Sequence, residues 1–533
     1  RPPVFDATLC MDGLSGLHPS GELWRDEPVG RPVDTGKLAC PLQLRCGEGR
    51  VIHLGIVRDA PANTAKDNKQ LQDDSSKSVG VRKPGTYLSL TLLLLAVGGV
   101  TVAFVNKAFH LDDTIFIRLA QEKLNHPLAL GLPDYGFGGD FFSQYLDTHP
   151  PLLASFISLL IHIFGGASET GLHLVFIIFP ALAAVSMFFL AKRFTGSPLL
   201  AAFLLVISPG FMVMSQSIMT DIPALAFWLA AIASYVYAVD REDNKLLILA
   251  SVFLVLAICT TYQSFSLVPL LLLYLLLNRR VTVKTLAPLG MTLIVLGAIF
   301  LFYFLATGGP PKLSYAIGLS LAPDVIANKL LSTLSVLGGS IIFPVFLVLG
   351  LLRERKEKLS YLVLFAVLFL FFLSKVSSGQ YTLLSAFLQV LFYATGILVI
   401  YRFFDVGIDA VIARPWKRGE EDNGDNGDNI FLILWICGVL AYSILLLPYA
   451  STRYLLPLFP PVVLMFVSFA RTIFPDYSSW LRFAAAASTC TLAMGLAPSI
   501  ADNKRAAVYR AFGSTAGEKP RDAKRGRTTA DKG

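Results

Sequence analysis

Charged side chains are scarce in this chain of 533 residues. Asp, Glu, Lys and Arg make up 15% of the residues, hydrophobic types make up 54%, and the mean hydropathy is +0.61. This balance excludes an ordinary soluble enzyme and predicts a polytopic membrane protein. Because a bilayer core offers no water to backbone groups, we expect the spans to be helices of roughly 20 residues and the fold class to be all-α.

Cysteine and glycine patterns that would mark a metal, redox or phosphate centre are also missing. The six cysteines show no metal-type spacing. Three lie in the polar N-terminal segment: Cys10, Cys40 and Cys46. The other three lie in apolar runs and are expected to be core thiols: Cys259, Cys437 and Cys490. The glycines of "YGFGGD" (135–140) follow no strand, so they predict no phosphate loop. The stretch "EEDNGDNGDN" (420–429) lacks the closing Glu of a calcium loop and indicates a flexible cytoplasmic linker.

Residues 1–85 differ from the rest of the chain. They are rich in Pro, Gly, Asp and Lys, and they lack the charged and apolar regions of a signal peptide. We expect a disordered cytoplasmic extension, or sequence upstream of the true start. The transmembrane domain is expected to cover 86–500, and a basic tail follows at 501–533.

The chain has a net charge of +8, and the basic residues between the apolar runs cluster in short loops. Alternate loops carry the basic residues, so the charge reports topology by the positive-inside rule and predicts no nucleic-acid surface. The pattern requires that the short apolar run 152–164 lie along the interface, because a crossing there would move nearly every basic loop outside. This placement gives about 13 spans. The first two are 86–105 and 171–190, and the last is 481–499. The runs after Ser197 and Tyr262 are counted among them. The first extracytoplasmic loop is then 106–170.

Two adjacent carboxylates stand out in this outer loop, in "FHLDDTIFIRLAQ" (109–121). Asp112 and Asp113 could act as a general base, as metal ligands, or as a cap on the helical stretch that follows. Other isolated charges fall on the same predicted face of the membrane: Asp140, Asp147, His149, Asp221 and Arg453. Acids facing a few basic groups have the composition needed to deprotonate an acceptor while neutralising a phosphate leaving group.

Four motifs occur in an order that is typical of one enzyme family: "FHLDDTIFIRLAQ", "THPPLLASFISLLIHIFG", "MSQSIMTDIPALAFW" and "RYLLPLFPPVVLM". The chain resembles the polytopic glycosyltransferases of the C superfamily over residues 86–500. Within these it is similar to the branch of the dolichyl-phosphate-mannose protein mannosyltransferases and the lipid A aminoarabinose transferase. The resemblance implies that Asp112, Asp113 or both occupy the general-base site, and that the donor is a sugar on a polyprenyl phosphate.

The chain departs from this family at one position that matters for a metal. Where the aminoarabinose transferase has Glu-Lys-Pro, this sequence has Thr148-His149-Pro150, so a metal-binding carboxylate is missing unless Asp147 substitutes. A divalent cation could still assist the phosphate, but the sequence fixes no ligands, and the metal site is unknown.

The remaining candidates have structural alternatives. His149 could contact donor phosphate or hold a turn, and Asp221 could join the site or cap the next helix. Arg453 could bind phosphate in bidentate fashion or extend to the interface. Lys375 is a second phosphate candidate, and Tyr262 with Gln263 could line a sugar pocket.

Together these features predict a membrane glycosyltransferase that moves a sugar from a polyprenyl-phosphate donor to an acceptor on the extracytoplasmic face, with inversion. The acceptor could be a protein, a lipid or a polysaccharide. A polytopic transporter or lipid flippase is the alternative, although its ionisable groups would lie within the spans. A non-catalytic scaffold of the same fold is a third reading. The resemblance favours a bacterial inner membrane, because no large lumenal domain interrupts the later loops.

Overall fold

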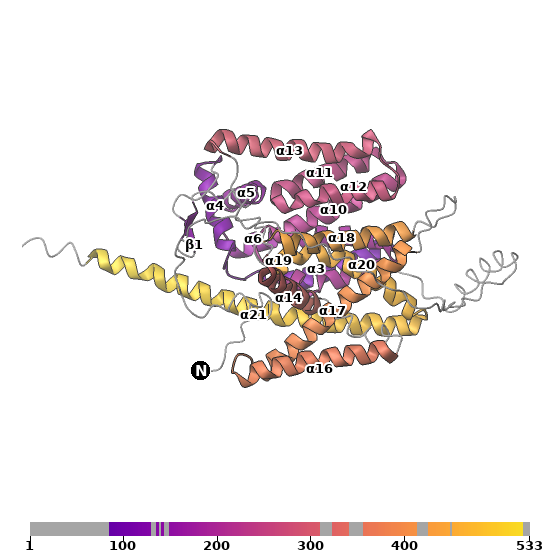
Figure 1. The fold of residues 1–533 in the computed structure, drawn as a ribbon. Helices are drawn as coiled ribbons and strands as arrows, with labels where there is room; N and C mark the ends of the chain where they lie inside the picture. The colour runs from indigo at the N-terminus through magenta and orange to yellow at the C-terminus, as the bar shows by residue number, and fades with distance from the viewer. Residues whose placement is uncertain are drawn as a thin grey trace, which may run out of the picture. The chain divides into compact units, whose positions relative to one another are not determined.

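The computed structural model describes residues 85–128, 135–137, 140–142, 149–309, 322–340, 355–412, 425–447 and 450–525. The described residues from 87 onward belong to one compact unit, and the packing described below lies within it. Its elements, drawn in Figure 1, are α3 (Thr86–Val102), α4 (Asp113–Asn125), β1 (Tyr135–Phe137), β2 (Asp140–Phe142), α5 (Leu152–Phe164), α6 (Glu169–Phe176), α7 (Ile178–Phe194), α8 (Pro198–Val206), α9 (Pro209–Met214), α10 (Asp221–Arg241), α11 (Asn244–Thr260), η2 (Tyr262–Ser266), α12 (Leu267–Leu277), α13 (Val283–Thr307), α14 (Pro323–Ser340), α16 (Arg355–Ser377), α17 (Leu383–Ile412), α18 (Asp425–Leu445), α19 (Thr452–Leu455), η4 (Leu456–Leu458), α20 (Phe459–Ile473) and α21 (Tyr477–Arg525).

The predicted class, a helical integral membrane protein, is confirmed. Within the described residues eight helices are long and apolar enough to cross a membrane, and four shorter apolar stretches accompany them. The sequence suggested about 13 spans, and the difference arises partly because some apolar runs form short or interrupted helices. The run after Ser197 is one case: it forms α8 and α9, which separate at Pro209, where Ser208 is extended with ψ of 141°.

Residues 106–170, the predicted first extracytoplasmic loop, contain helices α4 and α5. Helix α5 covers residues 152–164, and at ~1.5 Å per residue its 13 residues reach only about 20 Å, less than a hydrocarbon core. It ends at Gly165, whose φ of 67° lies in the left-handed region that favours glycine. Helix α5 packs against α4, and the antiparallel pair β1–β2 adds a short hairpin to the loop.

Helix α10 is the most enclosed of the candidate spans, with the largest share of its apolar window buried. It packs against α7 and α11, and α11 in turn packs against α13. Figure 1 shows α10, α11 and α13 side by side. Side chains such as Tyr235 and Leu229 are fully buried on α10. The central position of α10 fixes its first residue, Asp221, at one end of the bundle.

Helix α21 is longer than the last predicted span, 481–499, and continues past the expected domain boundary at residue 500 without a break. It packs against α8 and α9. Residues beyond 500 contact the segment that follows α3, since Asp502 pairs with Lys107 and Arg510 donates to the carbonyl of Asn106. This part of α21 therefore lies at the same end of the bundle as the acidic loop.

Helices α14 and α17 approach each other through glycine. A Cβ at Gly338 would overlap the carbonyl oxygen of Phe392, and one at Gly396 would overlap that of Leu334. Small residues allow such close approach where helices pack by dispersion and not by hydrophobic driving force. The contact positions α14, which also touches α9 and α19.

Gly338→Ala should therefore destabilise the protein by about 1–3 kcal/mol, the usual cost of overpacking a tight contact. Gly297→Ala in α13 is the matched control, because a Cβ there meets nothing within 4 Å. Thermal unfolding in detergent micelles measures both. Equal midpoints for the two variants would contradict the close helix crossing.

Candidate functional site

Three segments far apart in sequence meet around the guanidinium of Arg453. Its Nη1 donates a hydrogen bond of 2.5 Å to Asp112 Oδ2, and its Nε lies 3.6 Å from Asp221 Oδ1. Asp112 precedes α4, Asp221 begins α10, and Arg453 lies in α19. A guanidinium removed from water needs such partners, because an unpaired buried charge is costly.

The turn before α4 directs the two adjacent carboxylates differently. Leu111 has φ of 50°, a left-handed conformation that costs a residue with a side chain about 1–2 kcal/mol. The Thr114 hydroxyl holds this turn by donating to the Leu111 carbonyl at 2.7 Å. As a result Asp112 faces Arg453, while Asp113 points into the protein.

Asp113 is fully buried and acts as an anchor between two loops. Its Oδ1 accepts the Ile218 backbone N–H at 2.9 Å, and its Oδ2 lies 3.4 Å from both the backbone nitrogen and the ring Nδ1 of His110. Asp112 keeps 29% of its side chain exposed. Of the two acids, only Asp112 can therefore meet a substrate without breaking buried contacts.

His149 lies beside the aromatic ring of Phe116, with 5.6 Å between ring centroids. Burial, and secondly the nearby charge of Arg453, lower the pKa of His149 to about 3. The imidazole is neutral at physiological pH. It can donate or accept a hydrogen bond near Arg453, but it adds no positive charge to the site.

The other predicted site residues lie elsewhere or outside the described ranges. Lys375 lies in the last turn of α16, where its Nζ sits 5.8 Å from the centroid of the Phe371 ring. Among the described residues the ion pairs of Asp112 and Asp221 are with Arg453, and none is with Lys375. Asp140 belongs to β2, and Asp147 lies outside the described residues.

The carboxylates described here do not form a metal site. Within the described ranges no group of three His, Cys, Asp or Glu side chains could hold an ion. Asp112 and Asp221 both face Arg453, whose guanidinium occupies the position that a cation would take between them. Among the described residues this donor set does not fit a divalent cation.

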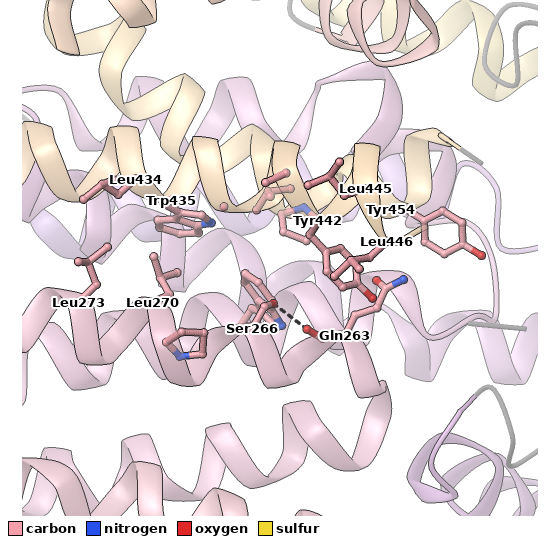
Figure 2. A pocket seen from close by; sticks show the side chains of 16 residues that line it. Gln263, Ser266, Leu270, Leu273, Leu434, Trp435, Tyr442, Leu445, Leu446 and Tyr454 are labelled. Carbon is pink, nitrogen blue, oxygen red and sulfur yellow. Dashed lines mark hydrogen bonds between the residues drawn. The ribbon is translucent and has the colours of Figure 1, made fainter. Parts of the chain in front are cut away.

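A cavity of about 470 Å³ opens between α10, η2, α12 and α18 next to this site. Tyr454, the residue after Arg453, lines one part of it together with Gln263 and Tyr442 (Figure 2). Leu270 and Trp435 line the part farther along α12 and α18. The walls are mostly apolar, so the cavity suits a hydrocarbon chain better than a free sugar.

Tyr262, the neighbour of Gln263, faces a different hollow. It lines a cavity of about 280 Å³ with Pro151 and Tyr303, and its ring contacts Phe300 edge-on. The short helix η2 therefore separates two apolar cavities. Of the pair suggested for a sugar pocket, only Gln263 reaches the cavity beside Arg453.

Sequence reasoning missed a buried group of charges behind the acidic loop. Asp502 on α21 contacts both Lys107 and His110, and Lys107 also donates to the Ser217 hydroxyl at 3.2 Å. Lys107 and His110 stand within six residues of the acidic pair, which was the available signal. Their partner Asp502 lies 392 positions after His110 in the chain, so the local sequence pattern did not reveal the contact.

Comparison with known proteins supports the family resemblance in one segment. The family model described as dolichyl-phosphate-mannose-protein mannosyltransferase matches residues 148–305. This range contains His149, Asp221 and Gln263 and excludes Asp112 and Arg453. No curated protein matches the chain at a significant level.

Solved structures with a similar trace come from three organisms. The Archaeoglobus fulgidus oligosaccharyltransferase is 15% identical with a TM-score of 0.45, over 78% of this chain and 55% of that chain, so the present chain spans about half the length of that enzyme. ArnT from Cupriavidus metallidurans in the apo state is 14% identical with a TM-score of 0.41, over 79% and 77%. The S. cerevisiae protein O-mannosyltransferase Pmt1–Pmt2 complex is 16% identical with a TM-score of 0.33, over 45% and 36%.

The different surroundings of the two acids lead to different expected stabilities. Asp113→Asn should lower the free energy of unfolding by about 1–3 kcal/mol, because the amide cannot serve all the donors around it in a buried site. Asp112→Asn has the same shape change in a partly exposed pair and should cost under about 1 kcal/mol.

The midpoint of thermal unfolding in detergent measures this difference. A larger loss for Asp112→Asn than for Asp113→Asn would contradict the assignment of Asp113 as the anchor.

Proposed function

We propose that this protein is a membrane glycosyltransferase that moves a sugar from a polyprenyl-phosphate donor to an acceptor on the extracytoplasmic face. The observation that carries the proposal is the Asp112–Arg453 pair, at 2.5 Å, beside an apolar cavity of about 470 Å³. A cation for phosphate, a partly exposed base and a space for a lipid tail are the three parts that such a reaction needs. The family match over 148–305 supports the donor class.

In this proposal the donor phosphate binds Arg453 and displaces Asp112 from it. An Arg fork suits phosphate oxygens, and Asp221 stays at Nε, so the guanidinium keeps one carboxylate partner when Asp112 is released. Lys375 is the weaker phosphate candidate, because the contact found for its ammonium is with the ring of Phe371 and not with these carboxylates. Neutral His149 contributes a hydrogen bond to the donor.

Released Asp112 then serves as the general base. It takes the proton from an acceptor hydroxyl or amine while that oxygen or nitrogen attacks the anomeric carbon from the side opposite the phosphate. The bond between the anomeric carbon and the phosphate oxygen breaks, its electron pair stays on the phosphate, and the configuration inverts. Polyprenyl phosphate leaves through the cavity, and Asp112 returns its proton to water.

The apolar cavity takes the beginning of the polyprenyl chain. Tyr454 and Gln263 face its end near Arg453, while Leu270 and Trp435 provide hydrocarbon contact farther away (Figure 2). Burial of the tail then helps to hold the phosphate at Arg453, and the tail itself needs no charged partner inside the membrane. The acceptor is a protein, lipid or polysaccharide group with a free hydroxyl or amine, and the proposed location is a bacterial inner membrane.

Asp112→Asn should reduce transfer roughly 10²–10⁴-fold, the range expected for losing a general base. The control is Asp324→Asn, which makes the same change at an exposed acid in the first turn of α14 and should leave the rate unchanged. Transfer of radiolabelled sugar from a panel of polyprenyl-phosphate sugars in proteoliposomes measures both variants.

Two outcomes of this assay would overturn the proposal. Equal transfer by wild type and Asp112→Asn would remove this acid as the base. Movement of intact labelled lipid between leaflets, with no donor consumed, would establish a flippase in place of a transferase.

A further inference from the structure

Asp502, on the C-terminal helix α21, contacts two basic side chains that lead to the acidic loop. Its Oδ2 lies 2.5 Å from Lys107 Nζ, and its Oδ1 lies 3.0 Å from His110 Nε2. Lys107 is fully buried and His110 is 3% exposed. Asp502 therefore holds these side chains in place, because moving it away would remove a carboxylate partner from two buried basic groups.

Further contacts connect Lys107 and His110 to the turn that holds Asp112, the proposed general base. His110 Nδ1 lies 3.4 Å from Asp113 Oδ2, and Asp113 directly follows Asp112 in the chain. Lys107 donates to Ser217, and Ile218 donates to Asp113, so the same group also holds the loop before Asp221. With His110 protonated, two positive and two negative charges balance inside this cluster.

We propose that Asp502 is a positioning residue for the active site: by holding His110 as a cation between itself and Asp113, helix α21 fixes the turn that presents Asp112 to Arg453. The catalytic part of this inference rests on the proposed function. The part that concerns the loop and its charge does not. Nothing in the sequence of the last apolar run suggested that it reaches the site.

The charges that face His110 come from every element around it. Asp113 lies on α4, Asp502 lies on α21, and Lys107 lies in the segment after α3, while the Tyr509 ring of α21 approaches edge-on at 6.1 Å. Burial lowers the pKa of His110, but the interactions with Asp113 and Asp502 outweigh it and raise the pKa above its usual value.

The direction of the pH effect follows from this raised pKa. A His whose pKa is higher in the folded state contributes stability that is fully present below its unfolded-state pKa. That contribution is lost as pH rises through the folded-state value. The loop is therefore expected to loosen on the alkaline side, and removal of Asp502 shifts this loss to lower pH.

Helix α21 has other contacts that keep it docked when Asp502 is changed. At Gly495 a Cβ would lie 2.5 Å from Met212 Sδ and 2.6 Å from the Ile207 carbonyl oxygen, which marks close packing on α8 and α9. Arg510 also pairs with Glu169 at 2.5 Å. Asp502→Asn therefore tests the position of the loop and not the presence of the helix.

The experiment compares wild type with Asp502→Asn, Asp502→Glu and Lys504→Gln from pH 5 to 9. Lys504 is the matched control, because it is exposed on the same helix and loses a charge two residues away. We expect Asp502→Asn to lower kcat about 10-fold to 100-fold, the effect of a misplaced catalytic group, with little change in the donor KM. In Asp502→Asn the fall of kcat at alkaline pH should begin at lower pH than in wild type. Asp502→Glu should restore part of the rate, and Lys504→Gln should match wild type.

A second readout separates this inference from the proposed function. The midpoint of thermal unfolding of the purified protein is measured over the same pH range without substrate. The inference expects the wild-type midpoint to fall at alkaline pH, and expects this fall at lower pH in Asp502→Asn. Wild-type protein that transfers no sugar but shows this shift would overturn the proposed function alone. Unchanged pH dependence of both kcat and the midpoint in Asp502→Asn would overturn the positioning role.

Discussion

The guanidinium of Arg453 is the interaction on which the candidate site depends. It joins the start of α4 through Asp112 and the start of α10 through Asp221, across 341 positions of sequence in the first case. Removing an arginine side chain from water is costly, and the carboxylates of Asp112 and Asp221 offset that cost. In the proposed reaction a phosphate enters this ion cluster by replacing Asp112 at Arg453, and the released carboxylate then acts as the base.

Two adjacent acids have different roles because their surroundings differ. The left-handed turn at Leu111 places Asp113 among buried donors and leaves Asp112 facing Arg453. Asp113 thus holds the turn in place, and Asp112 is the acid proposed to act as the base. The buried set continues through His110 to Asp502, so the last helix of the chain supports the first outer loop. A reacting side chain on a turn that other side chains hold in place keeps its position better than one on an isolated loop.

Much of the fold could be predicted from the sequence, because a bilayer imposes strong constraints on composition. Hydropathy and loop charge together predicted helix α5 at 152–164, and Gly165 ends it where expected. They did not predict the break at Pro209, since a continuous apolar run hides a local backbone constraint. Asp112, Asp221 and Arg453 could be found as isolated charges at the ends of apolar runs, but their pairing depends on how the helices pack. Asp502 was missed because a single acid near a basic tail has the pattern of a solvated residue, and only the course of α21 brings it to His110.

A structure of the protein in lipid nanodiscs with bound polyprenyl phosphate tests the central claim most directly. The account predicts the lipid phosphate within hydrogen-bonding distance of Arg453, the Asp112 carboxylate released from that guanidinium, and the first isoprene units beside Tyr442 and Trp435. Phosphate bound elsewhere, with the Arg453–Asp112 pair intact, would contradict it.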